Sequence, residues 1–335
     1  MSKKILILGA TGAMATYLIP ELLGKGYKVD GVTIEEVVSD NENLTYITHD
    51  AKDMAFLKEI LKNGYDAVVD FMIYNVLEDF KPYYNLFSEN TEHYLFFSTY
   101  RVYAGEYPIT ENSKRLWDEL PEGYITEREY SIYKAQEEDY IRASGRKNYT
   151  IVRPAITYST RRLQLTTLEA NTFVYRMLTG KTVVLPESAM DKQATMTWAG
   201  DVAKMLSAII LNPDAYGETY TVSTAEHMTW REVVKIFEEV GGLKYITVDD
   251  DTYVSLVASE AWAPYARQQL THDRCLNRVV DNSKILALMG VKQEDLMPLY
   301  EGIKKEFSQM TVEKIGCNEA INQRMDEYLA ALSSR

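Results

Sequence analysis

Cysteine is nearly absent from this chain of 335 residues, which contains only Cys275 and Cys317. Two cysteines with no close pairing cannot build a disulfide scaffold, so a reducing compartment is the simpler expectation. Histidine is also scarce, and no two histidines or cysteines have the spacing of a metal site. The four histidines are His49, His93, His227 and His272. We therefore expect neither a disulfide framework nor a bound metal.

Positive charge is in short supply as well, because 36 basic residues face 49 acidic ones and the net charge is −13. A general nucleic-acid binder needs a basic excess to neutralise phosphates, so that class is disfavoured. No apolar run approaches the roughly 20 residues that cross a bilayer. The first run, 5–8, is short and ends at a glycine, as a strand does and a signal peptide does not. We expect a soluble cytoplasmic protein without a nucleic-acid or membrane partner.

What the chain does contain is an alternation of strands and helices, with an apolar content of 46% that suits a proper core. Strands are predicted at 5–8, 28–34, 44–48, 67–72, 94–98 and 150–152. Helices are predicted between them at 14–23, 54–62, 79–92 and 130–143. Such alternation indicates βαβ units with right-handed crossovers. The predicted fold class is α/β, with a doubly wound parallel sheet of the Rossmann type.

Beyond Pro154 the pattern becomes less regular and mostly helical. We predict a dinucleotide-binding domain at 1–158 and a smaller substrate lobe at 159–335, in which 195–223 returns to the first sheet. Helices of the lobe are predicted near 166–179, 229–240, 250–260, 283–289 and 296–309, with a last amphipathic helix at 313–332. Nothing in the sequence assigns that last helix a role beyond packing.

A glycine-rich turn, Gly9-Ala-Thr-Gly12-Ala-Met-Ala15, follows the first strand. Gly9 permits a tight turn, Gly12 lets backbone approach a pyrophosphate, and Ala15 allows close contact between helix and strand. The N-terminus of the next helix favours negative charge. Such a turn can be merely structural, but its place between an apolar strand and an amphipathic helix favours a dinucleotide site. The predicted contacts here are Gly9, Thr11, Gly12, Ala13 and Met14.

The end of the second strand indicates which dinucleotide binds. Thr33 stands there, followed by Glu35 and Glu36, and no neighbouring arginine is available for a 2′-phosphate. NAD is therefore favoured over NADP, with Thr33, or Glu35, in place of the usual ribose-binding carboxylate. After the third strand, Asp50 and Ala51 are candidates for contact with adenine. An aspartate that caps a helix is an equally good interpretation of Asp50.

Tyr130 and Lys134 stand four residues apart within a predicted helix, so their side chains share one face, roughly 5–6 Å apart at Cβ. An ammonium beside a phenol favours the phenolate, which makes the tyrosine a better base. Such a base can take a proton from an alcohol while a nicotinamide takes the hydride. The spacing alone arises by chance in many chains. Its position about a hundred residues after the glycine-rich turn makes it informative.

With these two motifs, the chain resembles the extended short-chain dehydrogenase/reductase family, in the NAD-dependent epimerase/dehydratase branch that modifies nucleotide sugars. The resemblance runs from residue 5 to about residue 307 and includes four further segments. They are Phe-Ser-Thr-Tyr-Arg-Val-Tyr-Ala-Gly at 97–105, Ile-Val-Arg-Pro-Ala-Ile-Thr-Tyr at 151–158, Thr-Trp-Ala-Gly-Asp-Val-Ala at 197–203 and Val-Asp-Asn-Ser-Lys-Ile-Leu-Ala-Leu-Met-Gly at 280–290.

The resemblance implies roles for three residues. Thr99 would hydrogen-bond the reacting oxygen, Tyr130 would exchange its proton, and Lys134 would hold the nicotinamide ribose. Without the resemblance, Thr99 is equally a strand-end threonine that satisfies backbone groups. The resemblance also implies a homodimer formed by the helices at 79–92 and 130–143.

Departures from the family pattern narrow the chemistry. Dehydratases of the family carry an Asp-Glu pair directly after the catalytic threonine, whereas this chain has Tyr100 and Arg101, so elimination of water is not expected. Ile156 replaces an asparagine that often contacts the substrate, and Ala104 replaces a glycine. These changes affect the prediction of the substrate more than the prediction of the redox chemistry.

The candidate substrate contacts are Arg161, Arg162 and Arg274, because a planar guanidinium matches phosphate oxygens. Each is equally well interpreted as an exposed surface arginine. None of the 25 tyrosines is assigned to stacking on a base or sugar.

The leading functional hypothesis is an NAD-dependent epimerase that oxidises and re-reduces a secondary alcohol of a nucleotide-linked sugar. An NAD(P)-dependent sugar dehydrogenase or ketoreductase uses the same three residues, and an exchangeable cofactor would favour it over an epimerase. A non-catalytic nucleotide- or RNA-binding protein on the same fold is a second alternative, disfavoured by the net charge. A reductase of a small carbonyl compound is a third, favoured by Ile156.

Overall fold

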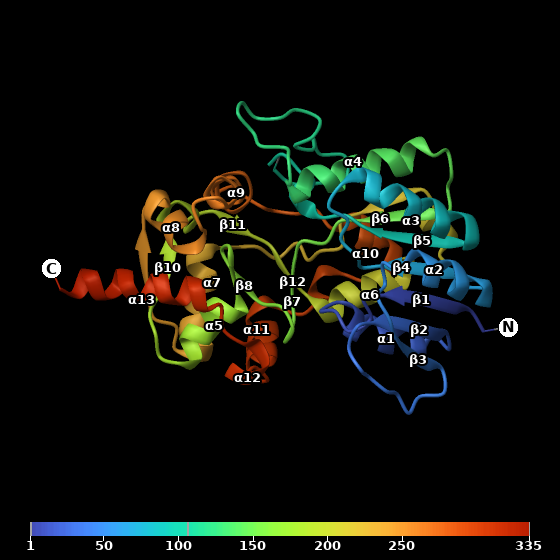
Figure 1. The fold of residues 1–335 in the computed structure, drawn as a ribbon, viewed down its shortest axis with the longest axis horizontal. Coiled ribbons are helices and arrows are strands. Elements are labelled where there is room, and N and C mark those ends of the chain that lie inside the picture. Colours follow the sequence, from blue (N-terminus) through green and yellow to red (C-terminus); the bar gives the residue numbers. More distant parts are fainter. Residues whose placement is uncertain (1, 106, 335) are drawn as a thin grey trace.

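The computed structural model describes residues 2–105 and 107–334. Its largest sheet has seven strands in the order β13-β6-β5-β4-β1-β2-β3, all of them parallel. The strands are β1 (Lys4–Leu8), β2 (Lys28–Thr33), β3 (Leu44–Thr48), β4 (Ala67–Asp70), β5 (His93–Phe97), β6 (Tyr149–Val152) and β13 (Glu218–Tyr220). This sheet lies at the end of the molecule opposite the C-terminal helix (Figure 1).

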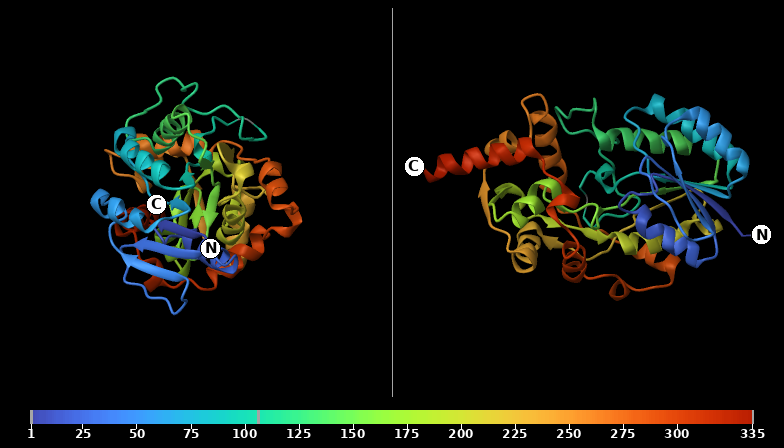
Figure 2. Two further views of the ribbon diagram at one scale, coloured as in Figure 1. Left: turned by 90° about the vertical axis from the view of Figure 1, so that its right-hand side faces the viewer. Right: turned by 60° about the horizontal axis from the view of Figure 1, so that its bottom comes forward.

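Helices cover both faces of this sheet, as the two views of Figure 2 show. They are α1 (Ala15–Gly24), α2 (Met54–Ile60), α3 (Leu77–Asn90), α4 (Tyr130–Ala143), α6 (Ala199–Ile209) and α10 (Ser283–Met289). Side chains of β1 alternate between the two faces because successive residues of a strand point to opposite sides. Ile5 and Ile7 pack with α1, α6 and α10, whereas Leu6 and Leu8 pack with α2, α3 and α4. The predicted doubly wound fold is confirmed.

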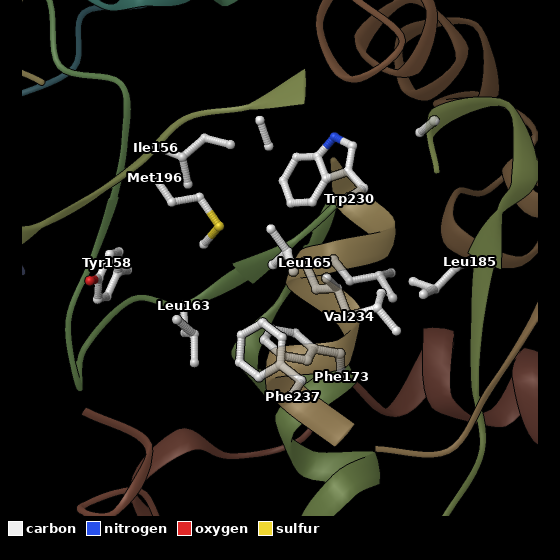
Figure 3. Packing of buried hydrophobic residues seen from close by; sticks show 14 of the residues in the cluster. Ile156, Tyr158, Leu163, Leu165, Phe173, Leu185, Met196, Trp230, Val234 and Phe237 are labelled. Atoms are coloured by element: carbon white, nitrogen blue, oxygen red, sulfur yellow. The ribbon is translucent and has the colours of Figure 1, made fainter. Parts of the chain in front are cut away.

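The other half of the chain builds a second core from small sheets and helices. Its strands are β7 (Ile156–Tyr158), β8 (Gln164–Leu165), β9 (Leu168–Glu169), β10 (Val183–Pro186), β11 (Gln193–Ala194), β12 (Met196–Trp198), β14 (Met228–Thr229) and β15 (Tyr245–Val248). Its helices are α5 (Ala170–Leu178), α7 (Trp230–Gly241), α8 (Asp250–Val257), α9 (Ala263–Gln269), α11 (Leu299–Phe307), α12 (Val312–Ile315) and α13 (Glu319–Ser333). Figure 3 shows Phe173, Trp230, Val234 and Phe237 packed together in this core.

The helix α7 illustrates how local sequence sets an element of this lobe. Thr229 accepts a hydrogen bond from the Glu232 backbone, and the Glu232 side chain accepts one from the Thr229 backbone, which closes a capping box. At the other end Gly242 adopts the left-handed conformation, with φ 66°, that ends many helices. The buried face between these caps carries Trp230 and Phe237.

Two helix predictions for the C-terminal part are wrong in their extent. The helix predicted at 313–332 is interrupted, since α12 ends before Gly316, whose φ is 69°, and Asn318 caps a separate helix α13. The helix predicted at 166–179 begins only at Ala170, because β8 and β9 form a short hairpin before it. Apolar spacing does not distinguish a broken helix from a continuous one.

Residues of α6 and β13 belong with the first sheet, because β13 pairs with β6 and α6 packs against α1. The domain boundary predicted at residue 158 stays a prediction. Within the described residues, we find no helix whose length and apolar character would suit it to span a bilayer.

Candidate active site

A cavity of about 510 Å³ opens where β1, β4 and β5 end. Its lining combines Gly12, Ala13 and Met14 of the glycine-rich turn with Thr99, Tyr130 and Lys134. Arg162 and Arg274 of the second half line the cavity as well. The cavity therefore brings together residues from both predicted domains, at the carboxyl edge of a parallel sheet where ligands of such folds bind.

The glycine-rich turn is tight and leaves donors free for an anion. Gly9 has φ 82°, and its N–H and that of Ala10 both donate to the Val32 carbonyl at 3.0 Å. A Cβ on Gly12 would lie 3.1 Å from the Gly9 oxygen, so a side chain there would crowd the turn. No side chain caps the N-terminus of α1, and its first turn contains no acidic residue. Its N–H groups therefore fit the pyrophosphate of a dinucleotide.

At the end of β2 the structure places an arginine that sequence proximity did not indicate. Arg161 donates to both carboxylate oxygens of Glu35, at 3.0 and 3.3 Å, although 126 residues separate the two. The hydrogen bonds from Arg161 and from Thr11 lower the pKa of Glu35. Arg161 does not line the 510 Å³ cavity. No arginine is close to Glu35 in the sequence, but in the structure Arg161 lies beside it. Arg161 is already paired with the Glu35 carboxylate.

Thr33, Asp50 and Ala51 lie beyond the residues that line the cavity. The Thr33 hydroxyl pairs with that of Thr11 at 2.8 Å, which joins the end of β2 to the glycine-rich turn. Asp50 accepts a hydrogen bond from the Lys52 backbone at 2.8 Å, so it stabilises the turn before α2. Ala51 is buried in the core. Contact of Asp50 or Ala51 with adenine stays a prediction.

Tyr130 is the first residue of α4, and Lys134 lies one turn later. Glu129 caps this helix by accepting a hydrogen bond from the Ser131 backbone at 3.3 Å. Thr99 follows β5, and its hydroxyl accepts a hydrogen bond from the Arg101 backbone at 3.2 Å. Thr99 thus satisfies a backbone group, as the alternative interpretation expected, while its own hydroxyl proton remains available. All three side chains line the cavity.

Lys134 is completely buried and forms an ion pair that the sequence did not reveal. Its Nζ lies 2.9 Å from Glu137 Oε2 and 4.7 Å from the centre of the Phe96 ring. The other oxygen of Glu137 has no hydrogen-bond partner among the described residues. Burial opposes the charge of Lys134, but attraction to Glu137, Tyr130 and Asp70 together outweighs burial and raises the pKa of Lys134.

A second buried carboxyl, Asp70 at the end of β4, interacts electrostatically with this pair. It accepts hydrogen bonds from Tyr94 at 2.9 Å, from Tyr74 at 3.1 Å and from the Met72 backbone at 3.0 Å. Burial raises the pKa of Asp70 and, against the attraction of Lys134, raises the pKa of Glu137 from 4.5 to about 7. Two acids and one ammonium thus share a buried site beside the cavity.

Glu137→Gln is expected to change the pH dependence of stability. Because the pKa of Glu137 is raised, the folded state binds more protons than the unfolded state between pH 4.5 and about 7, so wild-type stability falls as pH rises through that window. Glutamine cannot ionise, so the variant lacks this fall. The stability of the variant relative to wild type should grow by about 3 kcal/mol between pH 4.5 and pH 8.

Urea unfolding at several pH values checks this expectation, with Glu89→Gln, an exposed residue of α3, as the matched control. The charged groups that act on Glu137 are Lys134, Asp70 and Glu138. The tyrosines Tyr74 and Tyr94, which hydrogen-bond Asp70, also interact electrostatically with Glu137. All of them remain in the variant. A stability difference that stays constant over the whole pH range would show that Glu137 does not titrate as described.

The predicted arginines occupy three different environments. Arg162 is exposed and lines the cavity. Arg274 also lines it but is buried, with Nε 2.6 Å from the Thr166 carbonyl oxygen. Arg161 is engaged with Glu35 as described above. One further arginine, Arg101, lines the cavity beside Tyr130 and was not predicted as a binding residue.

Comparison with known proteins gives the family and the fold. The sequence profile described as the NAD dependent epimerase/dehydratase family matches residues 5–223. No curated protein sequence matches this chain. The resemblance inferred above from the glycine-rich turn, Tyr130 and Lys134 is thereby confirmed, while its extension beyond residue 223 stays a prediction.

Several solved structures share this architecture. UDP-glucose 4-epimerase of Thermotoga maritima with UDP-glucose is 17% identical, with a TM-score of 0.67, over 91% of this chain and 97% of that one. UDP-glucose 4-epimerase of Thermus thermophilus with NAD is 16% identical, with a TM-score of 0.66, over 92% and 100%. UDP-glucuronic acid 4-epimerase of Bacillus cereus, with UDP-glucuronic acid and NAD, is 16% identical, with a TM-score of 0.67, over 91% and 98%.

At these identities the structures establish the fold. The cofactor prediction is confirmed, since NAD is named in the description of the matching family and is bound in two of these three structures. The uncapped N-terminus of α1 and the crowded glycine turn fit that cofactor. This chain belongs to the NAD dependent epimerase/dehydratase family.

Proposed function

We propose that this protein is an NAD-dependent epimerase that acts on a nucleotide-linked sugar by oxidising and re-reducing one secondary alcohol. The observation that carries the proposal is the shared cavity, which Thr99, Tyr130 and Lys134 line together with the free N-terminus of α1. A base, a hydrogen-bond donor and a cation thus face the place where a dinucleotide fits. This combination supports oxidation of an alcohol.

In the proposed mechanism Tyr130 takes the proton of the sugar hydroxyl and Thr99 donates a hydrogen bond to the same oxygen. The Lys134 ammonium interacts electrostatically with Tyr130 and attracts the negative charge that develops at the reacting oxygens. Bound NAD supplies the hydride acceptor and, in the second half, the hydride donor. Once the keto sugar has turned its other face, Tyr130 returns the proton to the oxygen. The proton and the hydride each leave and return once, so no outside oxidant is needed.

Two features support a nucleotide-linked substrate. Arg162 is exposed and lines the cavity together with the buried Arg274, and the guanidinium group of Arg162 matches the oxygens of a diphosphate. Enzymes with the same fold have been solved with UDP-glucose and UDP-glucuronic acid. The buried side chain of Tyr100 and the cation of Arg101 follow Thr99, and neither supplies a carboxyl for elimination of water.

The experiment that tests the proposal screens nucleotide sugars for exchange of a carbon-bound hydrogen. Purified protein is first denatured, and the released dinucleotide is identified. Tightly retained NAD together with stereochemical inversion at one carbon is the expected result. Stoichiometric release of reduced NAD with an oxidised sugar would instead establish the alternative, a dehydrogenase with the same three residues. A lack of any reaction across the screen would contradict the proposal.

We also infer a homodimer formed by α3 and α4. The two helices pack against each other, with the ring centres of Tyr84 and Tyr140 5.7 Å apart. A groove between them is lined by Leu77, Tyr133 and Tyr140. Sedimentation should give the mass of two chains for wild type and of one chain for Tyr133→Glu. A monomeric wild type would contradict this inference.

A further inference from the structure

Arg101 is a charged residue beside Tyr130 that the mechanism above does not use. It lies in a short 3-10 turn, Tyr100–Val102, two residues after Thr99. Its guanidinium carbon is 5.8 Å from the centre of the Tyr130 ring, and its side chain is 19% exposed. Arg101, Tyr130 and Gln269 line both the active-site cavity and a second cavity of about 470 Å³. Arg101 therefore stands at the junction of two cavities, next to the proposed base.

The charges around Arg101 do not balance. We define the arginine cluster as Arg101, Arg274 and Arg278 together with the carboxylates of Glu129 and Asp273. Three positive charges face two negative ones, and every member except Arg101 is at most 4% exposed. Burial lowers the pKa of the neighbouring His272, which disfavours a further positive charge there. Among the described residues the cluster therefore carries a net positive charge, which is costly in a buried place unless an anion arrives.

Two of the three guanidiniums have their donors occupied. Arg278 donates to Asp273 at 3.2 Å and to the carbonyl oxygens of Tyr103 and His272 at 2.9 and 3.1 Å. Arg274 donates to Asp273, to the Thr166 carbonyl oxygen and to the side-chain oxygen of Gln164. These contacts tie both arginines to the surrounding backbone. Every guanidinium nitrogen of Arg274 and Arg278 therefore already donates within the protein, so neither arginine is free to bind a negatively charged ligand.

Arg101, in contrast, has donors to spare. Among the described residues, its side chain makes one hydrogen bond, to Glu129 at 3.2 Å. Its Nε has no hydrogen-bond acceptor among the residues that the structure describes, and Asp273 Oδ2 is 3.5 Å away. A guanidinium carries five N–H donors in a fixed plane. Arg101 is the one member of the cluster that faces both cavities. It therefore combines unsatisfied donors with the net positive charge of the cluster.

We propose that Arg101 binds a carboxylate on the sugar of the substrate, which makes the substrate class a nucleotide-linked sugar acid. This inference rests on the proposed function. A carboxylate supplies two coplanar acceptors and the missing negative charge, and the guanidinium fork matches that geometry. Because Tyr130 contacts the reacting hydroxyl, a group that reaches Arg101 sits near that carbon on the same ring. Arg162, which is exposed and lines the same cavity, is left for the diphosphate.

Calorimetric binding to the NAD-loaded protein tests this with four probes: UDP, UDP-glucose, UDP-glucuronate and free glucuronate. Wild type should bind UDP-glucuronate about tenfold or more tightly than UDP-glucose. Arg101→Gln should lose that preference by weakening only the acid, and Arg101→Lys should retain part of it, because lysine keeps the charge without the fork. Arg267→Gln, which removes an exposed arginine of α9, should match wild type.

The outcomes separate this inference from the proposed function. Binding of UDP and UDP-glucose with no preference for the acid overturns the inference and leaves the nucleotide site standing. Arg101-dependent binding of free glucuronate without binding of any UDP compound supports it and contradicts the nucleotide part of the function. Binding of neither acid overturns it. Turnover is measured as a control. An equal loss of kcat for acidic and neutral sugars in Arg101→Gln would show that Arg101 acts on Tyr130 and not on the carboxylate of the sugar.

Discussion

Tyr130→Phe is expected to lower turnover by about two to four orders of magnitude while NAD binding is retained. The hydroxyl is the group that exchanges the proton, and phenylalanine lacks only that group. The ring keeps its place beside the Arg101 guanidinium, 5.8 Å away. No described residue hydrogen-bonds the Tyr130 hydroxyl in the ligand-free chain, so its removal leaves no partner unsatisfied. The loss should therefore appear in kcat and not in stability.

The matched control is Tyr140→Phe on the same helix. The Tyr140 hydroxyl does not line the cavity and donates a hydrogen bond to Asn85, with a distance of 3.2 Å. This control should turn over as wild type does. Dinucleotide affinity and the thermal midpoint are measured for both variants. Near-normal turnover of Tyr130→Phe would show that another group moves the proton.

Glu138→Ala is expected to reduce the free energy of unfolding by about 3–5 kcal/mol, the largest stability change that we expect from a single side chain here. Glu138 accepts two hydrogen bonds from Arg153, at 2.8 and 2.6 Å, and both side chains are buried. Its loss leaves a buried guanidinium without its carboxylate. Arg153 continues into Pro154, whose carbonyl oxygen accepts a hydrogen bond from the Tyr100 backbone. This ion pair thus ties α4 to the turn that follows Thr99.

Urea unfolding of Glu138→Ala and of the double variant Glu138→Leu with Arg153→Met measures this effect. Replacing both charges by apolar groups should recover much of the lost stability. The pH dependence of this stabilisation can be checked too. Burial opposes the charge of Glu138, but Arg153, Arg142 and Ser98 together outweigh burial and lower the pKa of Glu138 to about 2. The stabilisation is present above the usual pKa of a glutamate and is lost as pH falls towards 2. An unchanged unfolding midpoint in Glu138→Ala would refute this assignment.

The parallel sheet and the two motifs were predictable because they are local. The run at 5–8 and the turn at Gly9 and Gly12 define the first strand, the turn and α1, and their spacing carries the cofactor prediction. Tyr130 and Lys134 share a helix, so their common placement on the cavity follows from helical geometry.

The contacts that set the charge of the site were not predictable because they join distant or ambiguous residues. Arg161 meets Glu35 across 126 residues, and no local pattern encodes that meeting. Glu137 lies three residues after Lys134, a spacing that normally indicates an exposed pair, but the packing of α4 on the sheet buries both. Arg101 gains its importance only from Glu129, Asp273 and two other arginines that the fold assembles.

The extent of the C-terminal helices depended on single residues whose effect the apolar pattern hides. Gly316 ends α12 because it leaves the helical region of φ, and Pro298 fixes the start of α11. Both positions are compatible with the amphipathic spacing on either side. The periodicity therefore predicted that helices exist there and misplaced their ends.

The most direct test of the central claim follows one hydrogen from the sugar to the nicotinamide. A nucleotide sugar deuterated at the reacting carbon is mixed with NAD-loaded protein, quenched during a single turnover, and the dinucleotide is recovered and weighed by mass spectrometry. We expect deuterium in the recovered reduced NAD from wild type and none from Tyr130→Phe. Formation of the epimer by wild type with no deuterium in the dinucleotide at any quench time would contradict that claim.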